Sequence, residues 1–131
     1  LGGNATWREG RYDSNKDGRL DSALPNNRIA NPFRGTLWGA YRFDNGVAVR
    51  VEGVGFSGRN APINIAGTIY PIKAGFTMNA SVAAPVYGGQ AFLSVNNLFD
   101  TLYENPTSTS VRNLTTYAWG RTVTAGWRRS F

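Results

Sequence analysis

An acidic loop at residues 13–21 has the residue spacing that points most directly to chemistry. Its sequence, DSNKDGRLD, resembles part of a calcium-binding loop, in which oxygen ligands alternate along the chain and a glycine permits a sharp turn. Leu24 stands where such a loop has its bidentate acid. The alternative is a polar surface loop in which Asp and Asn side chains stabilise turns. The candidate calcium ligands are Asp13, Asn15, Asp17 and Asp21.

Catalytic chemistry is poorly supported by the composition. The chain contains no His and no Cys, so the commonest general base and the thiol nucleophile are both missing. Its eight acidic residues lie mainly in predicted loops and form no recognisable pair. We therefore expect that the protein is not an enzyme and that no cofactor is required, with calcium at residues 13–21 as the one candidate.

The final segment, residues 117–131, predicts a membrane-spanning β-strand. One parity is mostly apolar with aromatic residues toward both ends, and the other parity is small and polar apart from Arg128. This is the form of a transmembrane strand with an aromatic girdle at each interface. Arg121 and Arg129 interrupt the apolar parity, and we expect both to lie near a membrane surface, where long side chains reach water. The apolar parity comprises Tyr117, Trp119, Arg121, Val123, Ala125, Trp127, Arg129 and Phe131.

Period-two alternation also predicts strands upstream, at 72–86, 89–97 and 46–57, before 44, and more weakly at 1–11. In 72–86 we expect Ile72 and Phe76 to face outward and Lys73 and Asn79 inward. Phe92 breaks the pattern of its strand. No run approaches the roughly 20 apolar residues of a membrane helix. The fold predicted is an all-β, antiparallel, up-and-down transmembrane barrel, of which this chain supplies about six strands.

The predicted connections alternate in length. Short turns are expected at 44–46, where Asp-Asn-Gly favours a type I′ hairpin, and at 85–89. Long stretches rich in Asn, Pro, Ser and Gly occupy 12–32, 58–71 and 99–116. Outer-membrane barrels have short periplasmic turns and long extracellular loops, which produces this order.

Two C-terminal motifs resemble those of TonB-dependent outer-membrane receptors. The stretch VNNLFD at 95–100, followed by Tyr103, resembles the "NLFD…Y" motif near the end of that family. The ending GRTVTAGW at 120–127, continuing to Phe131, resembles its last strand, and YRFDNG at 41–46 also fits. The resemblance implies a 22-stranded barrel around an N-terminal plug, located in the bacterial outer membrane, that imports ferric siderophores or similar scarce nutrients.

The resemblance also implies that residues 1–131 are the C-terminal part of a receptor barrel, without the plug. Six strands are fewer than the roughly eight that close the smallest barrel. The implied partners are a ferric siderophore, outer-membrane lipid, TonB through an N-terminal region absent from this sequence, and the barrel-assembly machinery. Trp127 and Phe131 are the predicted assembly signal.

Ligand contacts are expected mainly on the extracellular loops, because function concentrates on loops. The net charge of +6 suggests a lumen that attracts anionic complexes through Arg42, Arg50 and Lys73, or one in which these residues only line a polar wall. Basic residues are scattered rather than clustered, so no nucleic-acid partner is expected. The candidate ligand-binding residues are Asn60, Tyr70, Tyr103, Asn105 and Arg112.

Asn96, Asn97 and Asp100 are predicted to be structural, closing the strand before them with side-chain hydrogen bonds. Two alternatives to a TonB-dependent receptor remain open at this point. One is a different outer-membrane barrel, such as a porin. The other is a soluble β-rich binding module, which would stay monomeric without detergent.

Overall fold

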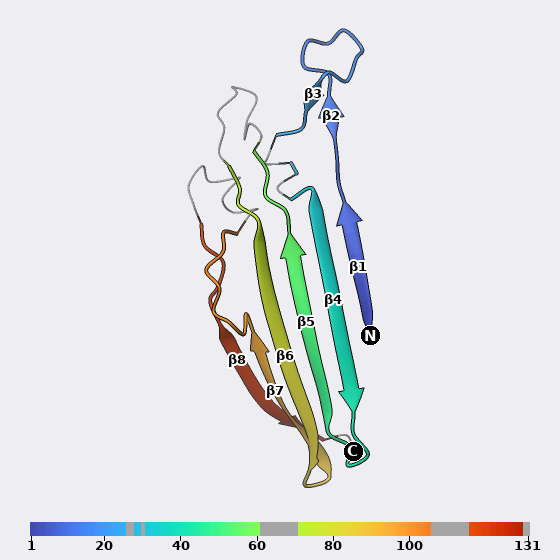
Figure 1. Cartoon of the computed structure of the whole chain (residues 1–131), viewed down its shortest axis with the longest axis vertical. Helices are drawn as coiled ribbons and strands as arrows, with labels where there is room; N and C mark the ends of the chain where they lie inside the picture. Colours follow the sequence, from blue (N-terminus) through green and yellow to red (C-terminus); the bar gives the residue numbers. More distant parts are fainter. Residues whose placement is uncertain (26–27, 30, 61–70, 106–115, 130–131) are drawn as a thin grey trace.

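The computed structural model describes residues 1–25, 28–29, 31–60, 71–105 and 116–129. Within them the protein is all-β and antiparallel, with one six-stranded sheet and one two-stranded sheet (Figure 1). The predictions of an all-β chain and of six strands paired in chain order are confirmed. The six strands, in spatial order, are β1 (Gly2–Trp7), β4 (Phe33–Arg42), β5 (Ala48–Phe56), β6 (Gly75–Val86), β7 (Gly89–Asn96) and β8 (Thr122–Arg128).

The two-stranded sheet begins at Arg11 and otherwise lies in the 12–32 stretch, which the sequence predicts to be a loop. It pairs β2 (Arg11–Tyr12) with β3 (Ser22–Ala23). The strand predicted at 1–11 therefore ends at Trp7, and Arg11 belongs to a separate hairpin. This hairpin carries the acidic loop at its tip, above the large sheet in Figure 1.

Two predicted strands are too long at the loop end. The strand predicted from residue 72 begins at Gly75, and Ile72 is only 3% exposed and pairs with Arg59 outside the sheet. The predicted outward position of Ile72 is wrong. The strand predicted from 117 begins at Thr122, because the N–H of Arg121 is donated to Asp100 instead of to a neighbouring strand.

Both short turns lie where predicted, but the type I′ geometry predicted for 44–46 occurs only in the second turn. In the 44–46 turn only Gly46 has a positive φ, of 84°, and its N–H is donated to the Phe43 carbonyl. This is a three-residue loop with a glycine in the left-handed region, so the predicted type I′ turn is wrong there. Between β6 and β7, Tyr87 and Gly88 have φ values of 49° and 69°, as a type I′ turn requires.

Short and long connections are sorted to opposite ends of the large sheet. The turns β4–β5 and β6–β7 lie at the lower end in Figure 1, and the connections β1–β4, β5–β6 and β7–β8 lie at the upper end. The predicted alternation of short and long connections is therefore confirmed. We refer below to the short-turn end and the long-loop end.

The strand registers assign every residue of the large sheet to one of two faces, because directly paired residues share a face and side chains alternate along a strand. The polar face holds Glu52 and the arginines of β4, β5 and β8, together with Asn, Gln, Ser and Thr side chains. The apolar face has no charged residue. Its members are Gly3, Ala5, Trp7, Phe33, Gly35, Leu37, Gly39, Tyr41, Val49, Val51, Gly53, Gly55, Phe76, Met78, Ala80, Val82, Ala84, Val86, Gly89, Ala91, Leu93, Val95, Val123, Ala125 and Trp127.

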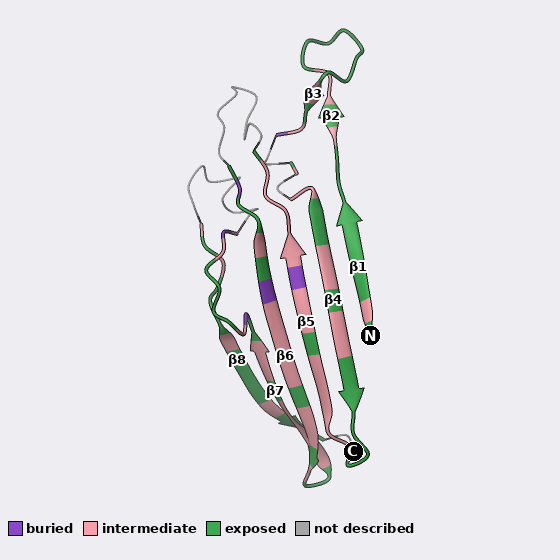
Figure 2. Cartoon of the chain, viewed as in Figure 1, coloured by how far each residue is buried: buried purple, intermediate pink, exposed green. Residues whose placement is uncertain are grey.

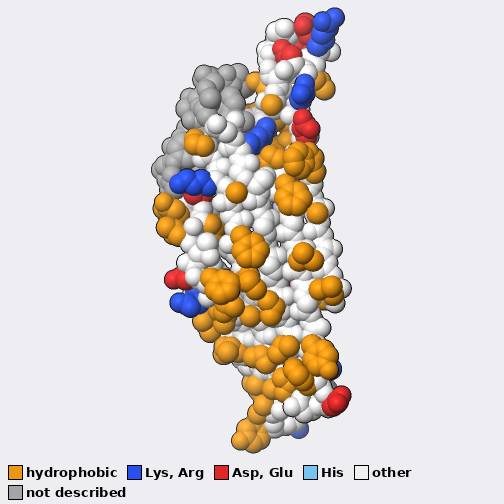
Figure 3. Space-filling model, viewed as in Figure 1, with side chains coloured by type: hydrophobic (Ala, Val, Ile, Leu, Met, Phe, Trp, Pro, Cys, Tyr) orange, Lys and Arg blue, Asp and Glu red, His pale blue; other side chains and the backbone are white. Residues whose placement is uncertain are grey.

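Burial is distributed in the opposite way to a soluble protein. The two most buried side chains of the large sheet, Val54 and Thr77, both lie on the polar face. The large apolar side chains are exposed, with Leu37 at 68% and Phe76 at 53% (Figure 2). Figure 3 shows hydrophobic side chains over the strands, with charged side chains toward the two ends and along one edge. Among the described residues, no layer of protein covers the apolar face.

Candidate functional site

A hollow of about 560 Å³ opens on the polar face at the long-loop end. Strands β4 to β8 and the β7–β8 connection all contribute to its lining. Polar side chains dominate, and three larger groups, Arg34, Tyr103 and Trp119, stand among them. The other lining residues are Asn31, Glu52, Val54, Phe56, Thr77, Asn79, Asn96, Asn97, Asn105, Ala118, Gly120 and Thr122.

The hollow brings together two of the predicted ligand-binding residues, Tyr103 and Asn105. Tyr103 is half-buried, and its ring lies 5.6 Å from that of Phe56. Asn60 is exposed and does not line the hollow. The other two candidates, Tyr70 and Arg112, lie outside the described residues.

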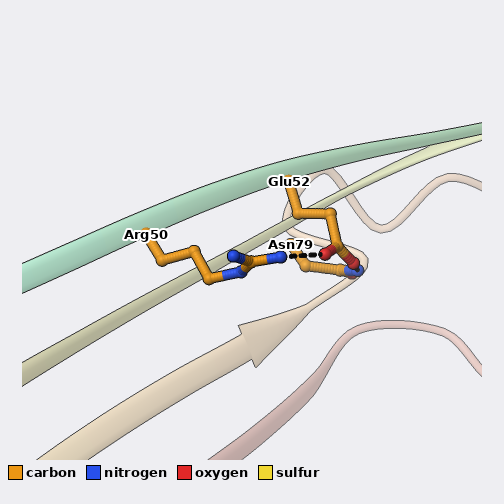
Figure 4. A network of polar contacts seen from close by, with 3 residues as sticks. All are labelled: Arg50, Glu52 and Asn79. Carbon is orange, nitrogen blue, oxygen red and sulfur yellow. Dashed lines mark hydrogen bonds and ion pairs between the residues drawn. The ribbon is translucent and has the colours of Figure 1, made fainter. Parts of the chain in front are cut away.

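A network of polar contacts joins two lining residues of the hollow to Arg50 on the polar face (Figure 4). Arg50 Nη2 lies 2.8 Å from Glu52 Oε2, and Asn79 Nδ2 donates to Glu52 Oε1 at 3.3 Å. The Arg50 guanidinium also lies over the Trp38 ring, 4.2 Å from its centroid. Glu52 is the one acid in the described strands of the large sheet, and it is bonded to Arg50 and Asn79. It therefore does not neutralise the other arginines of the polar face, which are Arg34, Arg42 and Arg128.

A second hollow, of about 540 Å³, lies on the same face toward the short-turn end. Three arginines line it: Arg42, Arg50 and Arg128. Arg128 is oriented by Gln90, whose Oε1 accepts hydrogen bonds from Nε at 3.1 Å and Nη2 at 2.6 Å. The predicted inward orientation of Arg42 and Arg50 is thus confirmed for the polar face.

Lys73 does not belong to this wall. It precedes β6, and its Nζ lies 4.0 Å from Oε1 of Glu104, which is only 6% exposed. The other Glu104 oxygen, Oε2, has no hydrogen-bond partner among the described residues. Lys73 thus lies outside the strands of the wall, beside the β7–β8 connection, and its lumen position stays a prediction.

The acidic loop uses its side chains to fix its own backbone. Asp13 Oδ2 accepts the N–H of Gly18 at 2.7 Å, and Asp17 Oδ1 accepts the N–H of Arg19 at 2.8 Å. Asp21 accepts both the N–H and the hydroxyl of Ser14, and these bonds lower the pKa of Asp21. No group of three or more acidic, His or Cys side chains within the described residues is arranged to hold a metal ion. Calcium binding here stays a prediction.

Side-chain contacts at the long-loop end join residues that follow the hairpin of β2 and β3 to residues that follow β5. Arg59 donates from Nη1 to the carbonyl of Ile29 and from Nη2 to that of Leu24. Its partial burial lowers the pKa of Arg59. Asn31 Nδ2 donates to the Ser57 carbonyl at 2.8 Å. The upper rim of the first hollow is thus held by bonds between segments far apart in sequence.

Sequence reasoning missed Arg34 and Asn31, and it misplaced Trp119. Arg34 lies on the parity of β4 opposite Leu37 and Tyr41, so extending that alternation backward would have found it. Trp119 was expected on the membrane face of the last strand, but it precedes β8 and lines the hollow. Of the predicted assembly signal, Trp127 lies on the apolar face and donates from Nε1 to the Val86 carbonyl, while Phe131 lies outside the described residues.

Within the described residues no helix is long and apolar enough to cross a membrane. No family model, no curated protein and no solved structure matches this chain.

Proposed function

We propose that this chain is the C-terminal part of the barrel of a TonB-dependent receptor in the bacterial outer membrane. In this proposal the receptor imports a ferric siderophore or a similar scarce nutrient. The chain contributes barrel wall, extracellular loops and the C-terminal assembly signal.

One observation carries the membrane part of the proposal: the apolar face is exposed and free of charge. A sheet in water buries its apolar face against another layer. A transmembrane barrel has the reverse arrangement, with apolar side chains toward lipid and polar ones toward the lumen. A soluble β-rich module would leave a six-strand apolar face in contact with water, which favours aggregation.

Aromatic side chains on the apolar face support the same assignment. Trp7 and Phe33 are paired near the long-loop end, whereas Tyr41 and Trp127, with Phe43 directly after β4, lie near the short-turn end. Eight to ten positions along β4 and the residue after it separate the two groups, or about 26–33 Å at about 3.3 Å per residue. At a strand tilt of about 40° this gives a band about 20–25 Å tall, close to the roughly 25 Å of outer-membrane barrels.

The transport part rests on the polar face and on the resemblance. The first hollow opens at the long-loop end, which is the extracellular end if short turns are periplasmic. Arg34 in the first hollow and Arg42 and Arg128 in the second favour an anionic cargo. Without the VNNLFD and GRTVTAGW motifs, the same wall would suit a porin equally well.

Uptake by whole cells tests the proposal. Cells lacking the gene are supplied with ⁵⁵Fe bound to hydroxamate, catecholate or carboxylate chelators, one at a time. We expect loss of uptake of one complex, and the same loss when the proton-motive force is collapsed in the parent strain. Growth on excess free iron serves as the control. Unchanged uptake of every complex would refute siderophore transport, while the location of the protein in outer-membrane fractions would still test the barrel.

A further inference from the structure

The turn at residues 97–101 is bonded both to itself and to β6. Asn97 closes it: Oδ1 accepts the Thr101 N–H at 3.0 Å, and Nδ2 donates to the Thr101 carbonyl at 2.9 Å. The N–H of Asn97 donates to Asn79 Oδ1 at 3.0 Å, and that of Leu98 donates to the Met78 carbonyl at 2.6 Å. Asn97 is only 4% exposed. The predicted structural role of Asn97 is confirmed, and the turn is held rigidly against the sheet.

The same turn reaches the start of β8 through Asp100. Its Oδ1 accepts the N–H of Arg121, the residue before β8, at 2.7 Å. A Cβ at Gly120 would lie 2.8 Å from that oxygen, so glycine permits the approach. Asn97 and Asp100 have φ values of 51° and 53°, a region in which Asn and Asp are enriched. One turn thus connects β6, the end of β7 and the beginning of β8.

This connection matters because β7 and β8 have no short hairpin between them. Residues 97–121 separate the strands, and so long a connection cannot fix their register as a two-residue turn does. A slip of one residue would exchange the two faces of β8 and is excluded by its alternation. A slip of two residues keeps every side chain on its own face. The alternation of β8 therefore leaves this slip open.

We propose that the 97–101 turn fixes the register of β8, with Asp100 selecting the pairing of Ser94 with Thr124 against slips of two residues. Asn97 acts indirectly: its bonds to Thr101 close the turn that carries Asp100. The inference goes beyond the proposed transport function: it concerns how the wall assembles and holds for any cargo.

Steric complementarity at the other end of the strands selects the same register. Phe92 lies over Gly126, where a Cβ would come within 2.6 Å of its ring. Trp127 lies over Gly89, where a Cβ would come within 2.7 Å. After a slip of two residues Thr124 or Arg128 would face Phe92, and the space that glycine provides would be lost. The turn and these two contacts therefore act together.

Disulfide trapping in the full-length receptor tests the register, and residues 1–131 add no Cys of their own to the engineered pairs. Ser94→Cys with Thr124→Cys reports the observed register. Ser94→Cys with Thr122→Cys, and Asn96→Cys with Thr124→Cys, report the two slips. Diagonal neighbours are about 7–8 Å apart, too far for a disulfide in the observed register.

Asp100→Gly and Asp100→Asn form a matched pair, because both residues tolerate a positive φ but only Asn keeps an acceptor oxygen. We expect Asp100→Gly to raise the cross-linked share of the slipped pairs about tenfold, and Asp100→Asn to behave as the unchanged chain. Asp44→Gly, in the β4–β5 turn, is the control for replacing an exposed turn Asp by Gly. Equal slipped shares in Asp100→Gly and Asp44→Gly would overturn the proposal.

If Asp100→Gly yields no assembled protein, Asp100→Asn decides. Assembly of Asp100→Asn with the Ser94–Thr124 cross-link would support the requirement for an acceptor at this position. Failure of Asp100→Asn to assemble would overturn the proposal, because a side-chain acceptor at position 100 would then be present without securing assembly.

Discussion

Arg34 is the charged residue of the first hollow with the clearest use in ligand binding. It is exposed on the polar face of β4, whereas Glu52, the acid of that hollow, is bonded to Arg50 and Asn79. An exposed guanidinium at the mouth of a hollow attracts an anionic ligand and can donate two parallel hydrogen bonds to a carboxylate. The hollow's aromatic groups, Phe56, Tyr103 and Trp119, supply flat apolar surface in the same lining.

Replacing Arg34 by Ala should weaken binding of the transported complex by about ten- to a hundredfold, since a hydrogen bond to a charged group contributes about 1.5–3 kcal/mol and about 1.4 kcal/mol is tenfold. Equilibrium titration of the purified protein with the complex identified by uptake measures this. The loss should shrink at high salt, because screening weakens the attraction. Arg19→Ala, on the acidic hairpin, is the control for removing an exposed arginine. Equal affinities of the two variants would show that Arg34 does not contact the ligand.

Asp21 provides a prediction about pH. The N–H and hydroxyl of Ser14 lower the pKa of Asp21 below its ordinary value of 3.8. The stabilisation that these bonds give the loop is therefore complete above that ordinary value and is lost as the pH falls through the lowered pKa. The Ser14 amide resonance should titrate at a pH below 3.8. Asp21→Asn should abolish that titration, and its persistence would assign the transition to another group.

At the scale of the strands, alternation in the sequence predicted which segments pair and which face is apolar. It did so because each strand has one face free of charge, from Leu37 in β4 to Val123 in β8. The strand ends were less predictable, since they depend on contacts between distant residues. Ile72 continues the apolar alternation of β6, yet it leaves the sheet to pair with Arg59. Arg121 continues that of β8, yet its N–H is taken by Asp100.

Leu37 tests whether the apolar face contacts lipid or water. It lies four positions from both Phe33 and Tyr41, midway between the two aromatic groups, and is largely exposed. In lipid, Leu37→Arg should lower the stability of the assembled protein by about 2–4 kcal/mol. In water an exposed Leu→Arg change typically alters stability by no more than about 0.5 kcal/mol. Urea unfolding in detergent micelles measures the difference.

Thr124→Arg is the matched control for Leu37→Arg, because Thr124 is exposed on the polar face. It should assemble with little loss of stability. Similar losses in both variants would indicate that the two faces share one environment, which contradicts a membrane wall.

At the scale of the whole molecule, the candidate site depends on topology more than on any motif. Arg34, Asn79 and Tyr103 come from β4, β6 and the β7–β8 connection, and nothing in their local sequences relates them. They meet because each strand pairs with the next at a fixed register. The alternation alone does not determine this register, because a shift of two residues keeps every side chain on the same face. Two of the loop residues predicted as ligand contacts, Tyr103 and Asn105, line the hollow, but the prediction overlooked the wall residues beneath them.

The large sheet is open, with β1 and β8 as its edges. Each edge strand turns about half of its backbone N–H and C=O groups away from its one neighbour. In hydrocarbon every such group costs several kcal/mol when unpaired, and together they exceed the roughly 5–15 kcal/mol by which a domain is stable. Under the proposed function both edges pair with further strands of the same barrel.

Residues 1–131 alone should therefore form no stable monomer in lipid. Refolded into liposomes, they should be degraded by added protease and show no change in gel mobility on heating. The full-length receptor, treated identically, is the control and should resist protease and shift on heating. A protease-resistant, lipid-inserted monomer of these residues alone would mean that six strands can satisfy their edges unaided, and the larger barrel would have to be abandoned.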